Sequence, residues 1–253
     1  ELPRQLPHAE GLTTLTASSP ESTEPGSDLS SAPPPASEFV WDWPTRLCHW
    51  LFVILVCVSW WSAEERMMDL HRQSGLILLG VIVFRVFWGF FGPTTARFAH
   101  FIKGPRAVLA YARSLVSGGH KLAFGHNPLG ALSVVALLLL LAMQVGLGLF
   151  SMDTDGLESG PLARHVSYET ADQITDLHED NFDILLILIG LHLAAVAFYA
   201  FVKRANLIGP MITGRRKLTA RTEPAVRRMA PAPITRVALG VAVAVLAVWF
   251  VTR

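Results

Sequence analysis

Apolar residues gather in five long stretches that polar segments separate. The stretches cover residues 47–63, 75–91, 129–150, 184–202 and 237–251. A helix rises about 1.5 Å per residue and a bilayer core is about 30 Å thick, so the first four can cross it fully or nearly so. The fifth is marginal; we expect it to cross, and lying at the membrane interface is the alternative. Because the runs are continuous rather than alternating, they indicate helices and not barrel strands.

This pattern predicts an all-α membrane protein, with a four-helix transmembrane bundle and a fifth C-terminal transmembrane helix. Composition agrees, because 51% of the residues are hydrophobic and 16% are charged, against about 25% charged in an average soluble domain. Residues 1–40 are rich in Ser, Thr, Pro, Glu and Gly and have no apolar core, so we expect a disordered tail and no cleavable signal peptide. The expected domains are this tail, a core over 41–218, and a linker with the extra helix over 219–253.

Charges between the runs are separated by sign. Segment 92–126 contains five Lys and Arg residues and no acidic residue, whereas segment 151–180 contains eight acidic residues and one Arg; the segment after the fourth run is again basic. Because Lys and Arg accumulate in cytoplasmic loops, the N-terminal tail is predicted to be cytoplasmic and segment 151–180 to face outward. Residues 98–115 mix apolar and basic side chains, which favours a helix at the inner headgroup surface, with a solvated loop as the alternative.

Four of the nine histidines fall at two depths. His71 and His178 lie at the predicted outer level, and His49 and His192 at the inner level. Fourteen residues separate the two histidines of the fourth helix, which is close to four turns and about 21 Å of rise, so both face the same way. Each histidine can therefore pair with one from another helix at its own level.

Two facing imidazoles in a helix bundle suit a haem iron, and with both axial positions filled they favour electron transfer over oxygen binding. The alternative is that each histidine is a hydrogen-bonded polar residue of the bundle core. His192 lies well inside an apolar run, where an ionisable group is by default a functional candidate. The sequence contains no Cys-x-x-Cys-His, which excludes c-type attachment.

Three further residues are candidates for the same sites. His126 precedes the third run and could replace His49 as the inner ligand, although the adjoining Asn127 and Pro128 are typical of a helix start. Arg85 lies fourteen residues after His71, and Arg46 lies one turn before His49. Both arginines could bind haem propionates, and the alternative for each is contact with lipid phosphate.

Four motifs resemble those of the bacterial cytochrome b561 family, particularly the branch similar to the cytochrome b subunit of nickel-iron hydrogenases. They are Pro44-Thr-Arg-Leu-Cys-His-Trp50, Leu70-His-Arg-x-x-Gly75, Phe84-Arg-Val-Phe-Trp-Gly89 and Gly125-His-Asn-Pro-Leu-Gly-Ala-Leu132. The resemblance covers about residues 39–218. It implies a bacterial inner-membrane protein with two b-type haems, the outer one on His71 and His178 and the inner one on His49 and His192. The family core ends after four helices, so the tail and the fifth helix are departures.

Three functions are consistent with these features. The leading hypothesis is electron transfer between a redox partner protein, such as a cytochrome or dehydrogenase subunit, and membrane quinone; the acidic outer segment would attract a basic partner. The second is a stand-alone quinone reductase that oxidises a small reductant such as superoxide. The third is a membrane anchor subunit of a larger oxidoreductase. The expected partners are membrane lipid, quinone and a redox protein, with no nucleic acid.

Overall fold

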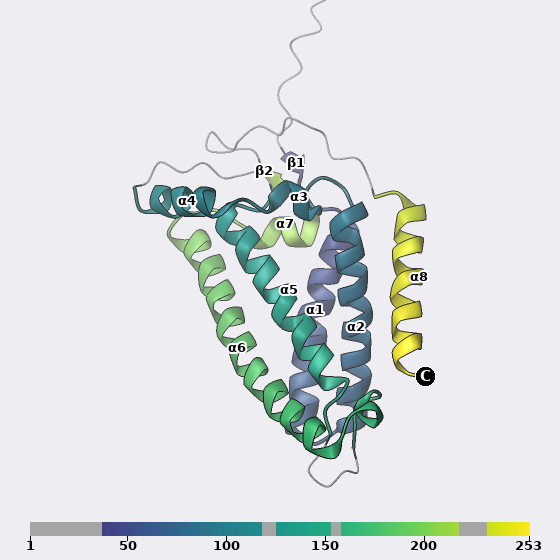
Figure 1. Cartoon of the computed structure of the whole chain (residues 1–253). Coiled ribbons are helices and arrows are strands. Elements are labelled where there is room, and N and C mark those ends of the chain that lie inside the picture. The colour runs from purple at the N-terminus through teal and green to yellow at the C-terminus, as the bar shows by residue number, and fades with distance from the viewer. Residues whose placement is uncertain (1–36, 118–124, 153–157, 218–231) are drawn as a thin grey trace, which may run out of the picture. The chain divides into compact units, whose positions relative to one another are not determined.

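The computed structural model describes residues 37–117, 125–152, 158–217 and 232–253 (Figure 1). All of them belong to the second of two units, residues 1–34 and 35–253, into which the chain divides. Most of the expected N-terminal tail and of the expected linker after residue 218 therefore lies outside the described residues.

Five helices are long and apolar enough to cross a membrane. They are α1 (Trp43–Glu64), α2 (Met68–Phe91), α5 (Pro128–Gly148), α6 (Tyr168–Phe201) and α8 (Ile234–Val251). Each contains most or all of one predicted apolar run, which confirms the all-α membrane fold. The fifth helix has 18 residues, three more than its apolar run of fifteen.

Helix α6 differs most from expectation, because it begins sixteen residues before its apolar run and has 34 residues in all. Ser167 caps its start, where the side chain accepts the N–H of Thr170 at 3.2 Å. Five acidic residues expected in the outward-facing connection therefore lie on the first turns of a helix instead: Glu169, Asp172, Asp176, Glu179 and Asp180. Two more, Asp153 and Asp155, lie outside the described residues. The start predicted for α5 is confirmed, because Asn127 accepts the N–H of Gly130 at 2.7 Å.

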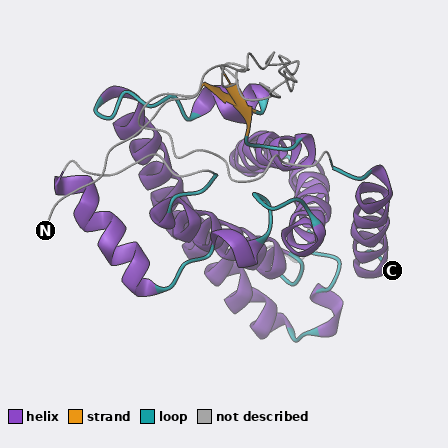
Figure 2. Ribbon diagram, turned by 90° about the horizontal axis from the view of Figure 1, so that it is seen from above, coloured by secondary structure: helices purple, strands orange, loops and turns teal. Residues whose placement is uncertain are grey.

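The core lies between α1, α2, α5 and α6. Its buried apolar side chains are Leu55, Leu78, Ile82, Leu141, Val145 and Leu185. Helix α8 packs on another face of α2, and Figure 2, which looks down the bundle, shows α8 at its outside. A Cβ added at Gly240 would lie 2.8 Å from a ring carbon of Phe87, so α8 approaches α2 through a residue without a side chain.

The smaller elements gather at one end of the bundle (Figure 1). They are the strands β1 (Ser37–Phe39) and β2 (Arg215–Lys217), which pair antiparallel, and the helices α3 (Phe98–Phe101), α4 (Pro105–Ser117) and α7 (Ile208–Thr213). Strand β1 thus begins within the range expected for the tail. The surface helix predicted over residues 98–115 is in fact two helices, α3 and α4, separated by Ile102–Gly104. Helix α4 lies across the ends of the long helices (Figure 1). It is held there by hydrogen bonds between the hydroxyls of Tyr111 and Tyr199 (2.8 Å) and from Lys203 to the Leu115 carbonyl (2.9 Å).

Candidate functional site

The outer histidines face each other across the bundle. His71 on α2 and His178 on α6 have ring centres 6.1 Å apart, with ring planes at 82°. The Nδ1 atom of His71 lies 2.8 Å from the Ser59 carbonyl oxygen, and that of His178 lies 2.9 Å from the Gln144 carbonyl oxygen. A carbonyl can only accept a hydrogen bond, so each Nδ1 carries the proton and donates it. The lone pair of each neutral ring is then on Nε2, which leaves this atom as the ligand.

This geometry fits a haem iron between the rings. An imidazole nitrogen binds a first-row metal at about 2 Å, and the ring centre lies roughly 1 Å further, so two axial imidazoles have centres about 6 Å apart. The two rings also line a cavity of about 980 Å³, which is within the range of cofactor sites. Gly75 also lines this cavity, and beyond its own helix backbone no atom of the described residues lies within 4 Å of a Cβ added there. The residues present therefore fit a flat macrocycle.

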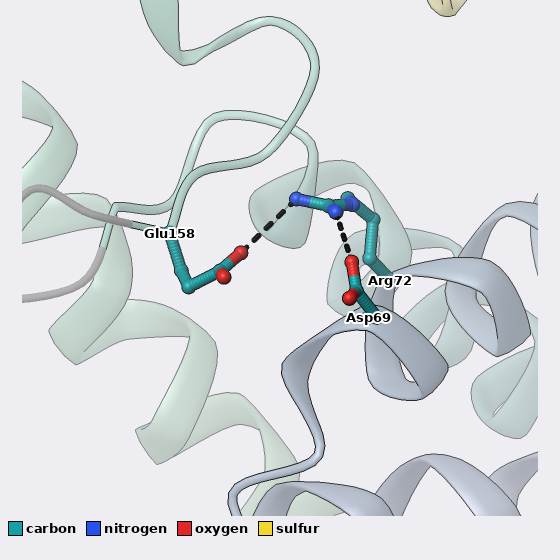
Figure 3. Close-up of polar contacts among 3 residues, drawn as sticks. All are labelled: Asp69, Arg72 and Glu158. Carbon is teal, nitrogen blue, oxygen red and sulfur yellow. Dashed lines mark hydrogen bonds and ion pairs between the residues drawn. The ribbon is translucent and has the colours of Figure 1, made fainter.

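The charged side chains of Arg72 and Glu158 line this cavity, and Figure 3 shows Arg72 in contact with both Glu158 and Asp69. Arg72 donates to Glu158 at 3.1 Å and to Asp69 at 2.5 Å. Glu158 comes from the segment between α5 and α6, so Arg72 ties that segment to α2. Thr175 adds a second connection, because its hydroxyl bonds both the N–H and the carbonyl of Met152. The described parts of the outer segment are thus fixed beside the cavity.

For the inner histidines the structure gives only an electrostatic interaction, between His49 on α1 and His192 on α6. The ring contact of His49 is with Trp50, 5.1 Å between ring centres. The Nδ1 atom of His49 is buried and has no hydrogen-bond partner among the described residues. The 34 residues of α6 form one continuous helix, so His178 and His192 keep the expected separation of about 21 Å along one face.

The sequence pattern of the family described as prokaryotic cytochrome b561 matches residues 40–214. The chain belongs to this family. Membership makes it a multi-pass membrane cytochrome and implies b-type haem and electron transfer across the membrane. Comparisons with curated proteins and with solved structures found no match. The matched range runs from just before α1 to the end of α7, so α8 lies outside the part of this cytochrome that the family defines.

The two arginines occupy different surroundings in the cytochrome. Arg46 donates to the Ile212 carbonyl at the end of α7, and its Nε is buried without a partner among the described residues. Arg85 is only 5% exposed and lies over the ring of Phe98, 5.3 Å from the ring centre. Contact with lipid phosphate is therefore wrong for Arg85. Its Nη1 is buried and has no partner in the described part of the chain.

His126, the alternative inner ligand, packs between two aromatic rings. Its ring centre lies 4.6 Å from that of Trp41 and 4.5 Å from that of Phe101. Burial, with a smaller contribution from the nearby Arg85 guanidinium, lowers the pKa of His126 to about 3, because both disfavour the imidazolium. His126 is therefore neutral at physiological pH.

Sequence reasoning missed the groups that orient the outer histidines. Ser59 and Gln144 act through their main-chain carbonyls, which no side-chain pattern reveals. The available signal was Gln144 itself, an amide in the middle of an apolar run, whose Nε2 donates to the His178 Nε2 at 3.1 Å. This bond uses the lone pair that an iron would take, so the Gln144 amide would have to turn away when haem binds. Asn181, 2% exposed, extends this network by donating to the Gln144 side-chain oxygen at 2.6 Å.

Proposed function

We propose that this cytochrome binds two b-type haems per chain, one on His71 and His178 and the other on His49 and His192. The observation that carries the proposal is the 6.1 Å separation of the outer rings, together with the two Nδ1 bonds to main-chain carbonyls. When bound, haem supplies one-electron chemistry at an iron whose axial positions are both filled. The chain then acts as a conductor between two redox partners.

The protein's own residues position the cofactor and control its surroundings. The Ser59 and Gln144 carbonyls fix the orientation of the two outer rings and raise their basicity. Leu78, Leu141 and Leu185 exclude water from the adjoining core. At the inner level, the buried unpartnered donors of Arg46 and Arg85 are suited to a propionate carboxylate through charge-assisted hydrogen bonds.

We further propose that electrons pass between membrane quinone and a redox protein at the outer side of the bacterial inner membrane. The charges support this orientation, because basic residues flank α3, α4 and α7 while acidic residues occupy the first turns of α6. The N-terminal segment is then cytoplasmic. An acidic outer end favours a basic partner, whose association should weaken as salt concentration rises.

Haem content tests the ligand assignment directly. The purified chain should show low-spin b-type bands in reduced-minus-oxidised spectra, and about two haems per chain by pyridine haemochrome. His178→Ala and His192→Ala should each lose one haem, the outer and the inner respectively. His165→Ala is the matched control, because His165 is exposed in a short 3-10 helix before α6 and should leave both haems in place. Absence of haem from the wild type, or retention of both haems by the two ligand variants, would refute the proposal.

A further inference from the structure

A separate group of buried polar side chains lies at the inner end of α1 and α2. Asp42 is 1% exposed, Arg85 5% and Thr45 6%. Asp42 immediately precedes α1, a position where Asp usually caps the helix, yet its side chain makes no capping bond. Its Oδ2 instead accepts the indole N–H of Trp88 at 2.7 Å. The carboxylate is therefore directed into the protein interior.

Several atoms of this group have unused hydrogen-bonding capacity. Asp42 and Thr45 lie near each other, yet within the described residues Asp42 Oδ1, Thr45 Oγ1 and His126 Nδ1 are buried without a hydrogen-bond partner. Arg85 Nη1 is also unpartnered there, and it is the donor proposed above for a propionate. The residues are neighbours, because Arg85 interacts electrostatically with both Asp42 and His126. Burying polar atoms unpaired is costly, and such atoms in native proteins are normally paired with ordered water. Donors and acceptors are both present, as a bound water requires.

We propose that Asp42, Thr45, Arg85 and His126 enclose a hydrated proton-binding site, and that the Asp42 carboxylate takes up a proton when the inner haem site gains an electron. The proposal rests on the proposed inner haem at His49. One electron arrives from the redox partner or from quinol, and one proton arrives from the inner aqueous phase and converts the carboxylate to the carboxylic acid. The electron's charge is thereby compensated within the bundle.

The position of Asp42 makes such coupling strong enough to measure. Seven residues separate Asp42 from His49, which is about two helical turns, so the two lie on the same side of α1 and about 10 Å apart. A unit charge at about 10 Å, with an effective dielectric constant of about 20, changes a proton affinity roughly tenfold.

The groups around the carboxylate leave it as the proton acceptor. Burial raises the pKa of Asp42 above its ordinary value, although the Thr45, Trp88 and Arg85 side chains oppose the shift. The other charged or titratable neighbours are Cys48 on α1, Arg85 on α2 and His126 before α5. His126 is neutral at physiological pH, and the Arg85 guanidinium stays charged. Neither group therefore changes its charge when an electron reaches the inner haem site.

Redox titration of the full chain in lipid nanodiscs between pH 5 and 9 tests the proposal. The potential of the inner haem should fall with pH in the wild type by about 59 mV in total, because a tenfold change in proton affinity shifts a one-electron potential by that amount, and the steepest slope should be about 30 mV per pH unit. Asp42→Asn keeps an acceptor for Trp88 and should abolish this slope. Asp172→Asn is the matched control, because Asp172 is exposed on α6, and it should keep the slope.

A second readout uses the wild type alone, so poor folding of Asp42→Asn does not block the test. Reduction should cause proton uptake, detected with an indicator dye, and should produce a carboxylic acid C=O band in the infrared difference spectrum. A pH-independent inner potential, or no proton uptake, in a chain that holds both haems would overturn this proposal and leave the proposed function intact. A wild type without the inner haem would overturn both.

Discussion

Gly148 allows a specific test of the outer site, because it lies against the His178 ring. A Cβ at this position would be 3.0 Å from Cε1 and 3.3 Å from Nδ1 of His178. Carbon atoms pack best at about 3.5–4.0 Å, so Gly148→Ala should push the ring away by about 0.5 Å. The bond from Nδ1 to the Gln144 carbonyl, now 2.9 Å, would lengthen to roughly 3.4 Å and leave the usual range for hydrogen bonds.

The expected result is selective weakening of the outer haem. Loss of an orienting bond to a metal-ligating histidine typically costs about 10–100-fold in affinity, which corresponds to about 1.4–2.7 kcal/mol. The substitution also gains up to about 1 kcal/mol of helix propensity, so the fold itself should survive. The inner haem, about 21 Å away along α6, should be unaffected.

Gly146→Ala is the matched control. It lies on the same helix, gains the same propensity, and has no atom within 4 Å of the added Cβ. Haem retention after dilution into haem-free detergent should be measured for both variants, with the inner haem as internal reference. Equal retention of the outer haem by Gly148→Ala and Gly146→Ala would refute the assignment of His178 as a ligand held by this contact.

Three further predictions concern the rest of the chain. Glu158→Gln should lower stability by less than about 1 kcal/mol, since the ion pair with Arg72 is partly exposed; a larger loss of thermal stability would contradict this. Because the pKa of His126 is about 3 in the fold and about 6.5 when unfolded, the unfolded state binds more protons between these values. Stability should therefore be full above pH 6.5 and fall on acidification toward pH 3, and thermal melts of His126→Gln should show a smaller decrease. Deletion of residues 232–253 should leave both haems bound, because the proposed ligands lie on α1, α2 and α6, whereas α8 packs on α2 from the outside of the bundle through Gly240 and Phe87. Loss of haem from the shortened chain would show that α8 supports the core.

The helices were predictable because lipid requires every backbone polar group to be satisfied within its own segment. The apolar runs therefore located the five long helices, α1, α2, α5, α6 and α8. Their ends were less predictable, since polar residues can continue a helix beyond the membrane. The additional turns at the start of α6 contain Glu169 and Asp172 and have no apolar signal, yet the Ser167 cap begins the helix there.

The pairing of histidines by depth was predicted because helix rise converts residue number into height. The structure brings the rings of His71 and His178 close together and gives an electrostatic interaction between His49 and His192. That these pairs hold haem stays a prediction. Contacts made through main-chain carbonyls were beyond prediction, because any residue type can supply them. The direction of the Asp42 carboxylate was equally hidden: the sequence suggests an ordinary cap, and only packing against Trp88 shows that it is turned inward.

The unbroken length of α6 has a consequence for the speed of conduction. Electron tunnelling slows steeply with distance, and here a single rigid rod carries one proposed ligand of each haem. The distance between the two proposed haems is then set by the rise of the helix, and not by loops, lipid or a partner protein. One residue inserted between His178 and His192 would turn one of the two rings about 100° away from its proposed iron.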